Sequence, residues 1–127
     1  MNKVERDDAR ENRILNEAVV DAHGPEEQAM GWYYYLEDRM MFPFQAICDR
    51  KRPISPLQPG EIVTVRKMAP ETECEREMFA EIDWNDQTLA VPLSQLGAPD
   101  EFPDDLEETH EALNDWRYWV DRGYQLG

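Results

Sequence analysis

Hydrophobic residues recur at helical spacing through the N-terminal third of the chain. One apolar stripe predicts a helix over residues 3–22. Its members are Ile14, Leu15, Ala18, Val19 and Ala22. After Gly24 and Pro25, which suit the end of one helix and the first turn of the next, a second stripe predicts a helix that runs to about Met40. Gly31 inside this helix costs about 1 kcal/mol relative to alanine, which predicts close packing at that point.

The middle of the chain changes to the two-residue period of strands. Alternating segments at 42–48 and 62–68 predict two strands, and 79–84 with 88–93 predict a hairpin that turns at Asn85 and Asp86. A final amphipathic segment predicts a helix that stops at Gly123. Its inner residues are Leu106, Leu113, Trp116 and Val120. We therefore expect a compact α+β domain over residues 1–127, with N-terminal helices and a C-terminal helix around a small antiparallel sheet, strongly bent or SH3-like.

Charge changes this picture, because 28 Asp and Glu stand against 13 Lys and Arg and give a formal net charge of −15. The negative charges of such a domain repel one another, and a bound cation, a basic protein or counter-ions would relieve this repulsion. The same charge disfavours nucleic acid and anionic lipid as partners. The chain has no apolar run of about 20 residues, as a membrane span requires, and residues 1–13 are too polar for a signal peptide. We expect a cytoplasmic monomer.

Catalytic chemistry is absent from the sequence. It contains no P-loop and no glycine-rich dinucleotide motif, and its serines lie in no nucleophile context. Cys48 and Cys74 are expected to be buried thiols and not a disulfide. Together with His23 and His110, expected on the surface, they have no paired spacing typical of a zinc site. We expect no enzyme.

Carboxylates are the candidate metal ligands, because calcium takes 6 to 8 oxygen ligands. Glu71, Glu73 and Glu75 occupy alternate positions just before a predicted strand. In an extended chain these side chains would share one face at a spacing of about 7 Å. Two or three carboxylates at this spacing could close around one ion. The alternative is a solvated acidic edge that prevents strand-to-strand aggregation.

A second candidate lies in the last turn of the predicted aromatic helix. Glu37 and Asp38 stand where helix carbonyls already carry partial negative charge, so a carboxylate there favours a cation. Helical geometry points Asp38 away from the core of its own helix. The alternative is a frayed, exposed helix end.

A third acidic group is the predicted hairpin tip, with Asp83 and Asp86 beside Asn85. These residue types are ordinary turn formers, so we rank both as secondary candidates. The segment is no EF-hand loop, because Thr88 and Ser94 replace the glycine and glutamate that such a loop requires.

Four stretches of the sequence resemble the small bacterial calcium-binding proteins of the CcbP type. They are 31–37 (GWYYYLE), 69–75 (APETECE), 84–96 around WND and LAVPLSQL, and 115–119 around DW and YW. The resemblance runs from about Val4 to Tyr124. It implies an acidic, non-EF-hand α/β domain that binds calcium in cytoplasmic storage or signalling, and it favours Asp38 and the 71–75 run as ligand sources.

We therefore predict a non-enzymatic protein that buffers or senses calcium through Asp38 with Glu37 and through Glu71, Glu73 and Glu75. Magnesium should compete poorly, because it demands near-ideal octahedral geometry and sheds water reluctantly. The main rival is an acidic interaction protein that mimics nucleic acid toward a basic partner. A hydrolase with paired carboxylates is a weaker rival, because no such pair is marked in the sequence.

Overall fold

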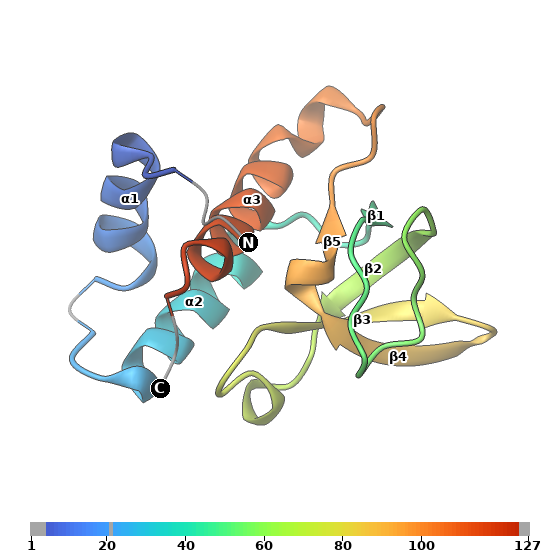
Figure 1. Cartoon of the computed structure of the whole chain (residues 1–127), viewed down its shortest axis with the longest axis horizontal. Helices are drawn as coiled ribbons and strands as arrows, with labels where there is room; N and C mark the ends of the chain where they lie inside the picture. Colours follow the sequence, from blue (N-terminus) through green and yellow to red (C-terminus); the bar gives the residue numbers. More distant parts are fainter. Residues whose placement is uncertain (1–4, 21, 125–127) are drawn as a thin grey trace.

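A computed structural model of the chain describes residues 5–20 and 22–124. Helices occupy one side of the molecule and a curled antiparallel sheet the other (Figure 1). The helical side contains α1 (Asp8–Arg13), the π-helical turn η1 (Ile14–Ala18), α2 (Pro25–Arg39) and α3 (Glu107–Asp121). The α+β class predicted from the sequence is confirmed.

The first helix is shorter than predicted. Residues 3, 4 and 21 lie outside the described residues, and α1 begins after Asp7, whose side chain accepts a hydrogen bond from the Arg10 amide. The chain then widens into η1, where the Val19 amide bonds the Ile14 carbonyl five residues back. A π turn rotates later positions away from a 3.6-residue stripe. Leu15, predicted to be buried, is accordingly 52% exposed.

Helices α2 and α3 pack together around aromatic side chains, as their stripes predicted. Trp32 of α2 is fully buried and meets Trp116 and Trp119 of α3 edge to face, with ring centroids 5.1 and 5.6 Å apart. Edge-to-face pairs of this kind add to the free energy of burial alone. The helix-to-helix contact is therefore a well-packed apolar core.

Buried carboxylates join α1 to this core. Glu11 accepts hydrogen bonds from the hydroxyls of Tyr118 (2.8 Å) and Tyr124 (2.6 Å). The Tyr124 hydrogen bond in particular holds the pKa of Glu11 below its usual value. Asp115 of α3 receives hydrogen bonds from Arg10, Arg13 and Tyr35. None of these contacts follows from hydrophobic periodicity.

The sheet has the strand order β4-β3-β2-β1-β5, and all its neighbouring strands are antiparallel. The strands are β1 (Phe44–Cys48), β2 (Ile62–Met68), β3 (Phe79–Trp84), β4 (Gln87–Pro92) and β5 (Leu96–Gly97). An irregularity between Val65 and Lys67 of β2 shifts the register against β3, as bulges in strongly bent sheets do. The sheet is curled into a half-barrel, in agreement with the predicted strong bend.

The predicted hairpin is present. Asn85 and Asp86 connect β3 to β4 with φ angles of 48° and 64°. Two residues in the left-handed region form the turn type that matches the twist of paired strands. Short 3₁₀ turns link the other elements: η2 (Glu71–Glu73), η3 (Leu93–Gln95) and η4 (Asp104–Leu106).

Cys48 and Cys74 are free and buried, as predicted. The prediction for His110 is wrong: it is buried, with its ring between Phe44 and Phe102, because α3 turns this position toward β1 and the connector before η4. His23 is exposed. Within residues 5–20 and 22–124, no helix has the length and apolar character that crossing a membrane requires.

Candidate metal centre

The C-terminal turn of α2 exposes Glu37 and Asp38 to solvent, and the exposure of Asp38 agrees with the prediction from helical geometry. They line an open groove of about 760 Å³ between η1 and α2, together with Glu17, Ala18, Val20, Gly31, Tyr34, Tyr35 and Arg39. Arg39 forms an ion pair with Glu17 and lies 3.7 Å from Glu108. The two terminal carboxylates therefore sit in an acidic groove whose basic side chain already has acidic partners.

The segment 71–77 is not extended, contrary to the sequence prediction. Residues 71–73 form the turn η2, and the following Cys74 is buried. Two contacts fix this shape: the Tyr33 hydroxyl donates to the Ala69 carbonyl at 2.8 Å, and the Phe79 amide lies 3.4 Å from the Cys74 sulfur. The turn breaks the two-residue alternation, because Glu71, Thr72 and Glu73 are all exposed. Glu71, Glu73 and Glu75 stay exposed but do not form one regular row.

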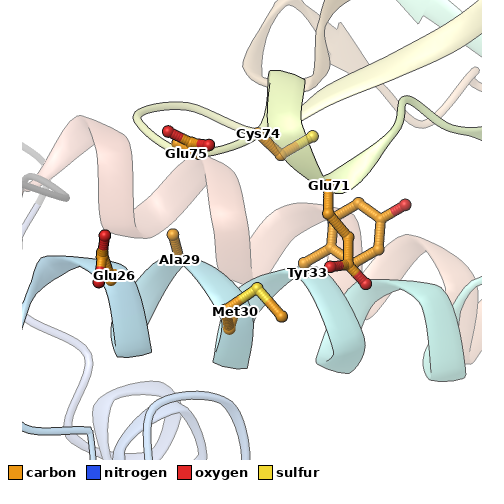
Figure 2. A pocket seen from close by; sticks show the side chains of 7 residues that line it. All are labelled: Glu26, Ala29, Met30, Tyr33, Glu71, Cys74 and Glu75. Atoms are coloured by element: carbon orange, nitrogen blue, oxygen red, sulfur yellow. The ribbon is translucent and has the colours of Figure 1, made fainter.

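The loop of residues 70–75 lies against α2 and encloses a groove of about 270 Å³. Its lining consists of Glu26, Ala29, Met30, Tyr33, Glu71, Cys74 and Glu75. Figure 2 shows Glu71 beside Tyr33 and Glu75 above the part of α2 that carries Glu26 and Ala29. The apolar side chains form the floor, and the three carboxylates belong to its lining from two different elements.

Glu71 joins this loop to the end of α2 through Tyr34, whose hydroxyl donates a hydrogen bond to Glu71 Oε1. That bond raises the pKa of Tyr34, and the charge of Glu37 adds to the effect. Burial, followed by the charge of Glu37, raises the pKa of Tyr33 to about 12, and Glu71 contributes in the same direction. Glu37 and Glu71 therefore act on the same two hydroxyls, although they line different grooves.

Asp83 and Asp86 lie apart from this arrangement. The tip of the β3–β4 hairpin points away from the helices (Figure 1) and borders its own groove with Trp84, Asn85, Gln87 and Thr88. Both oxygens of Asp83 accept hydrogen bonds from Arg66 at 2.6 to 3.0 Å. This guanidinium holds the pKa of Asp83 below its usual value. Asp83 thus has a cationic partner within the protein.

The chain can now be compared with known proteins. The family model Calci_bind_CcbP, described as "Calcium binding", matches residues 12–120. The chain belongs to the CcbP family of calcium-binding proteins. The crystal structure of Anabaena CcbP is 42% identical, with a TM-score of 0.81 and 98% of each chain covered. A calcium binding protein in the calcium-binding form is 41% identical, with a TM-score of 0.79 and 98% of each chain covered. Among curated protein sequences, none matches the chain.

The donor chemistry of this CcbP-family chain fits calcium, because the candidate side chains supply hard carboxylate oxygens. The candidate carboxylates are spread apart. Among the described residues, no three or more Asp, Glu, His or Cys side chains converge as a metal-binding group. Backbone carbonyls, water and movement of the exposed carboxylates would have to complete a coordination sphere. Of the predicted ligands, Asp38 lines one acidic groove and Glu75 the other, while Glu73 lies in the turn η2 of the loop.

Sequence reasoning missed Glu26 and the role of Tyr34. The site residues predicted from the sequence do not include Glu26, which lines the groove opposite Glu75. They do not include Tyr34 either, which is 49% exposed and donates a hydrogen bond to Glu71. The helical period indicates that Tyr34 is exposed, because Met30 and Tyr34 are four residues apart and lie off the buried stripe.

Proposed function

We propose that this CcbP-family chain is a non-enzymatic protein that binds calcium where the 70–75 loop meets α2. Glu37 and Asp38 would supply oxygens from the helix, and Glu71, Glu73 and Glu75 from the loop. The observation that supports the proposal is the Tyr34 hydrogen bond to Glu71, because it attaches the loop to α2 about one helical turn before Glu37 and Asp38. Calcium-binding relatives across 98% of the chain support the choice of ion.

In this proposal the acidic side chains attract the ion, and α2 and the loop hold it. Exposed carboxylates on neighbouring elements repel one another, and a divalent cation between them relieves that repulsion. The remaining oxygens would come from carbonyls and water, which calcium accepts readily in flexible geometry. Magnesium is disfavoured because it sheds water reluctantly and needs near-ideal octahedral geometry. We assign the protein a role in buffering or sensing cytoplasmic calcium in bacteria.

The test is calorimetric titration of calcium into the metal-stripped protein, with excess magnesium and about 0.15 M salt to screen diffuse attraction. We expect saturable binding. Glu71→Gln and Asp38→Asn should each weaken it at least about tenfold or remove a site, which corresponds to about 1.4 kcal/mol. Asp105→Asn is the matched control, because it removes one exposed acidic charge outside both grooves, and it should leave the affinity unchanged.

Three results would argue against this site. Equal loss of affinity in Asp105→Asn and Glu71→Gln would mean that calcium responds only to total charge. Loss confined to Asp83→Asn or Asp86→Asn would place the ion at the hairpin tip. Weak heat that salt abolishes in every variant would favour the rival interpretation, an acidic surface for a basic partner.

A further inference from the structure

An exposed apolar strip lies between the two acidic grooves. Its members are Met30 and Tyr34 of α2, which are 38% and 49% exposed, and Val20 after η1, which is 54% exposed. Met30 and Tyr34 are neighbours at i and i+4 on one helix face, and Tyr34 and Val20 line the same groove. Figure 2 shows Met30 on α2 beside the groove of the 70–75 loop. We call these three side chains the α2 apolar strip.

Acidic side chains flank this strip on both sides. The groove on one side is lined by Glu26, Glu71 and Glu75. The groove on the other side is lined by Glu17, Glu37 and Asp38, with Arg39 as its basic residue. Arg39 already pairs with Glu17. An apolar centre with an acidic rim is complementary to a surface with an apolar centre and a basic rim.

We propose that the α2 apolar strip is the docking surface for a basic amphipathic helix of a partner protein. The apolar side of that helix would cover Met30, Tyr34 and Val20, and its Lys and Arg side chains would meet the flanking carboxylates. Amphipathic helices are recognised in this way, through apolar anchors at i, i+3, i+4 and i+7 of the bound helix that cover an apolar surface. A second copy of this chain is disfavoured, because its own strip has the same acidic rim.

The inference rests in part on the proposed function, because Glu37, Asp38 and Glu71 would serve both calcium and the partner. Each bound calcium cancels negative charge that the basic helix needs. By thermodynamic linkage, calcium lowers the affinity for the helix by the same factor by which the bound helix lowers the affinity for calcium. Calcium would then release the partner without any change of fold.

The first experiment titrates a synthetic peptide of about 18 residues, or five helical turns, with Leu at helical spacing, Lys elsewhere and one Trp for fluorescence. The full chain is used with a chelator at about 0.15 M salt. We expect the double change Val20→Ser with Met30→Ser to weaken binding at least about tenfold. Ile54→Ser is the matched control, since Ile54 is 61% exposed beside Lys51 and Arg52, and it should bind like the unchanged protein.

A peptide of the same composition in scrambled order tests whether charge alone acts. It should bind at least about tenfold more weakly than the amphipathic peptide, and equal binding would overturn the proposal. So would equal affinity of the double variant and Ile54→Ser for the amphipathic peptide. Sedimentation of the free protein adds a further check: a dimer that Met30→Ser dissociates would make a second copy the occupant.

The second experiment repeats the titration in saturating calcium and, as a control, in the same concentration of magnesium. Calcium should lower the affinity for the peptide at least about fivefold, and magnesium should lower it clearly less. Calcium binding to the free protein is measured separately. If calcium binds and the peptide affinity does not change, the shared carboxylates are ruled out. If calcium does not bind, the proposed function fails, and the peptide results alone decide the docking surface.

Discussion

Asp115 is the residue on which three elements converge. Its fully buried carboxylate accepts hydrogen bonds from Arg10 at 2.5 Å, from Arg13 at 2.6 and 3.0 Å, and from Tyr35 at 2.7 Å. The donors come from α1 and α2, and the acceptor from α3. A buried carboxylate is tolerated when its oxygens are satisfied in this way. The ion pairs therefore fix where α1 lies on the helical layer.

Replacement of Asp115 by alanine should destabilise the protein by about 3 kcal/mol, because two partly buried guanidiniums and a buried hydroxyl would lose their acceptor. Urea unfolding followed by tryptophan fluorescence measures this change. Asn114→Ala, one position along α3 and exposed, should change the free energy of unfolding by less than about 0.5 kcal/mol. Equal effects of the two substitutions would show that the ion pairs of Asp115 do not stabilise the fold.

Individual side-chain partners were the part of the molecule that the sequence did not predict. The exposure of Asp38 followed from helical geometry alone. The Arg66 partner of Asp83 and the Tyr34 partner of Glu71 join residues 17 and 37 positions apart. Such pairs depend on how strands and loops register against helices. The sequence therefore ranked Asp83 as a secondary candidate on turn chemistry alone and did not identify Arg66 as its partner.

At the scale of elements, Gly31 governs the packing of η1 on α2. A methyl group at this position would overlap the backbone carbonyl oxygen of Ala18. A backbone atom cannot move aside as a flexible side chain can. The close packing predicted from a glycine inside a helix is thus confirmed, and its partner is η1.

Gly31→Ala should lower the free energy of unfolding by up to about 2 kcal/mol. Overpacking costs about 1 to 3 kcal/mol, and the gain of about 1 kcal/mol in helix propensity offsets only part of it. Thermal or urea unfolding measures the difference. Gly24→Ala provides the comparison, because nothing lies within 4 Å of a methyl group there. A stabilised Gly31→Ala protein would show that η1 shifts freely on α2.

Regular elements were predictable to the extent that their periods are regular. The periods of α2, α3 and the β3–β4 hairpin are unbroken, and the structure contains all three. The prediction was wrong at Leu15, which lies in the π turn η1, and at 71–77, where the 3₁₀ turn η2 replaces an extended chain. Both departures come from tertiary contacts with α2, namely Gly31 with Ala18 and Tyr33 with Ala69.

At the scale of the whole molecule, the net charge of −15 opposes folding through self-repulsion. Raising NaCl from about 0.05 to 0.5 M shortens the screening length severalfold and should raise the midpoint of thermal unfolding. Calcium should do so at far lower concentration if it binds as proposed. At 100 times its dissociation constant, one site adds about 2.7 kcal/mol.

Scanning calorimetry in NaCl, in magnesium and in calcium at matched ionic strength separates these contributions. Identical midpoints in the magnesium and calcium series would show that screening accounts for the whole effect. A calcium-specific rise that Glu71→Gln reduces, and Asp105→Asn does not, would assign the added stability to the loop and α2.

Cys74 gives the groove beneath the 70–75 loop a further property. Its thiol is buried against α2, and burial raises its pKa, so little reactive thiolate reaches solvent. Thiol reagents attack the thiolate, and a side chain that is 2% exposed gives them little access while the 70–75 loop lies against α2. The rate of Cys74 alkylation should therefore report how often the 70–75 loop separates from α2, and this thiol serves as the probe without any added label.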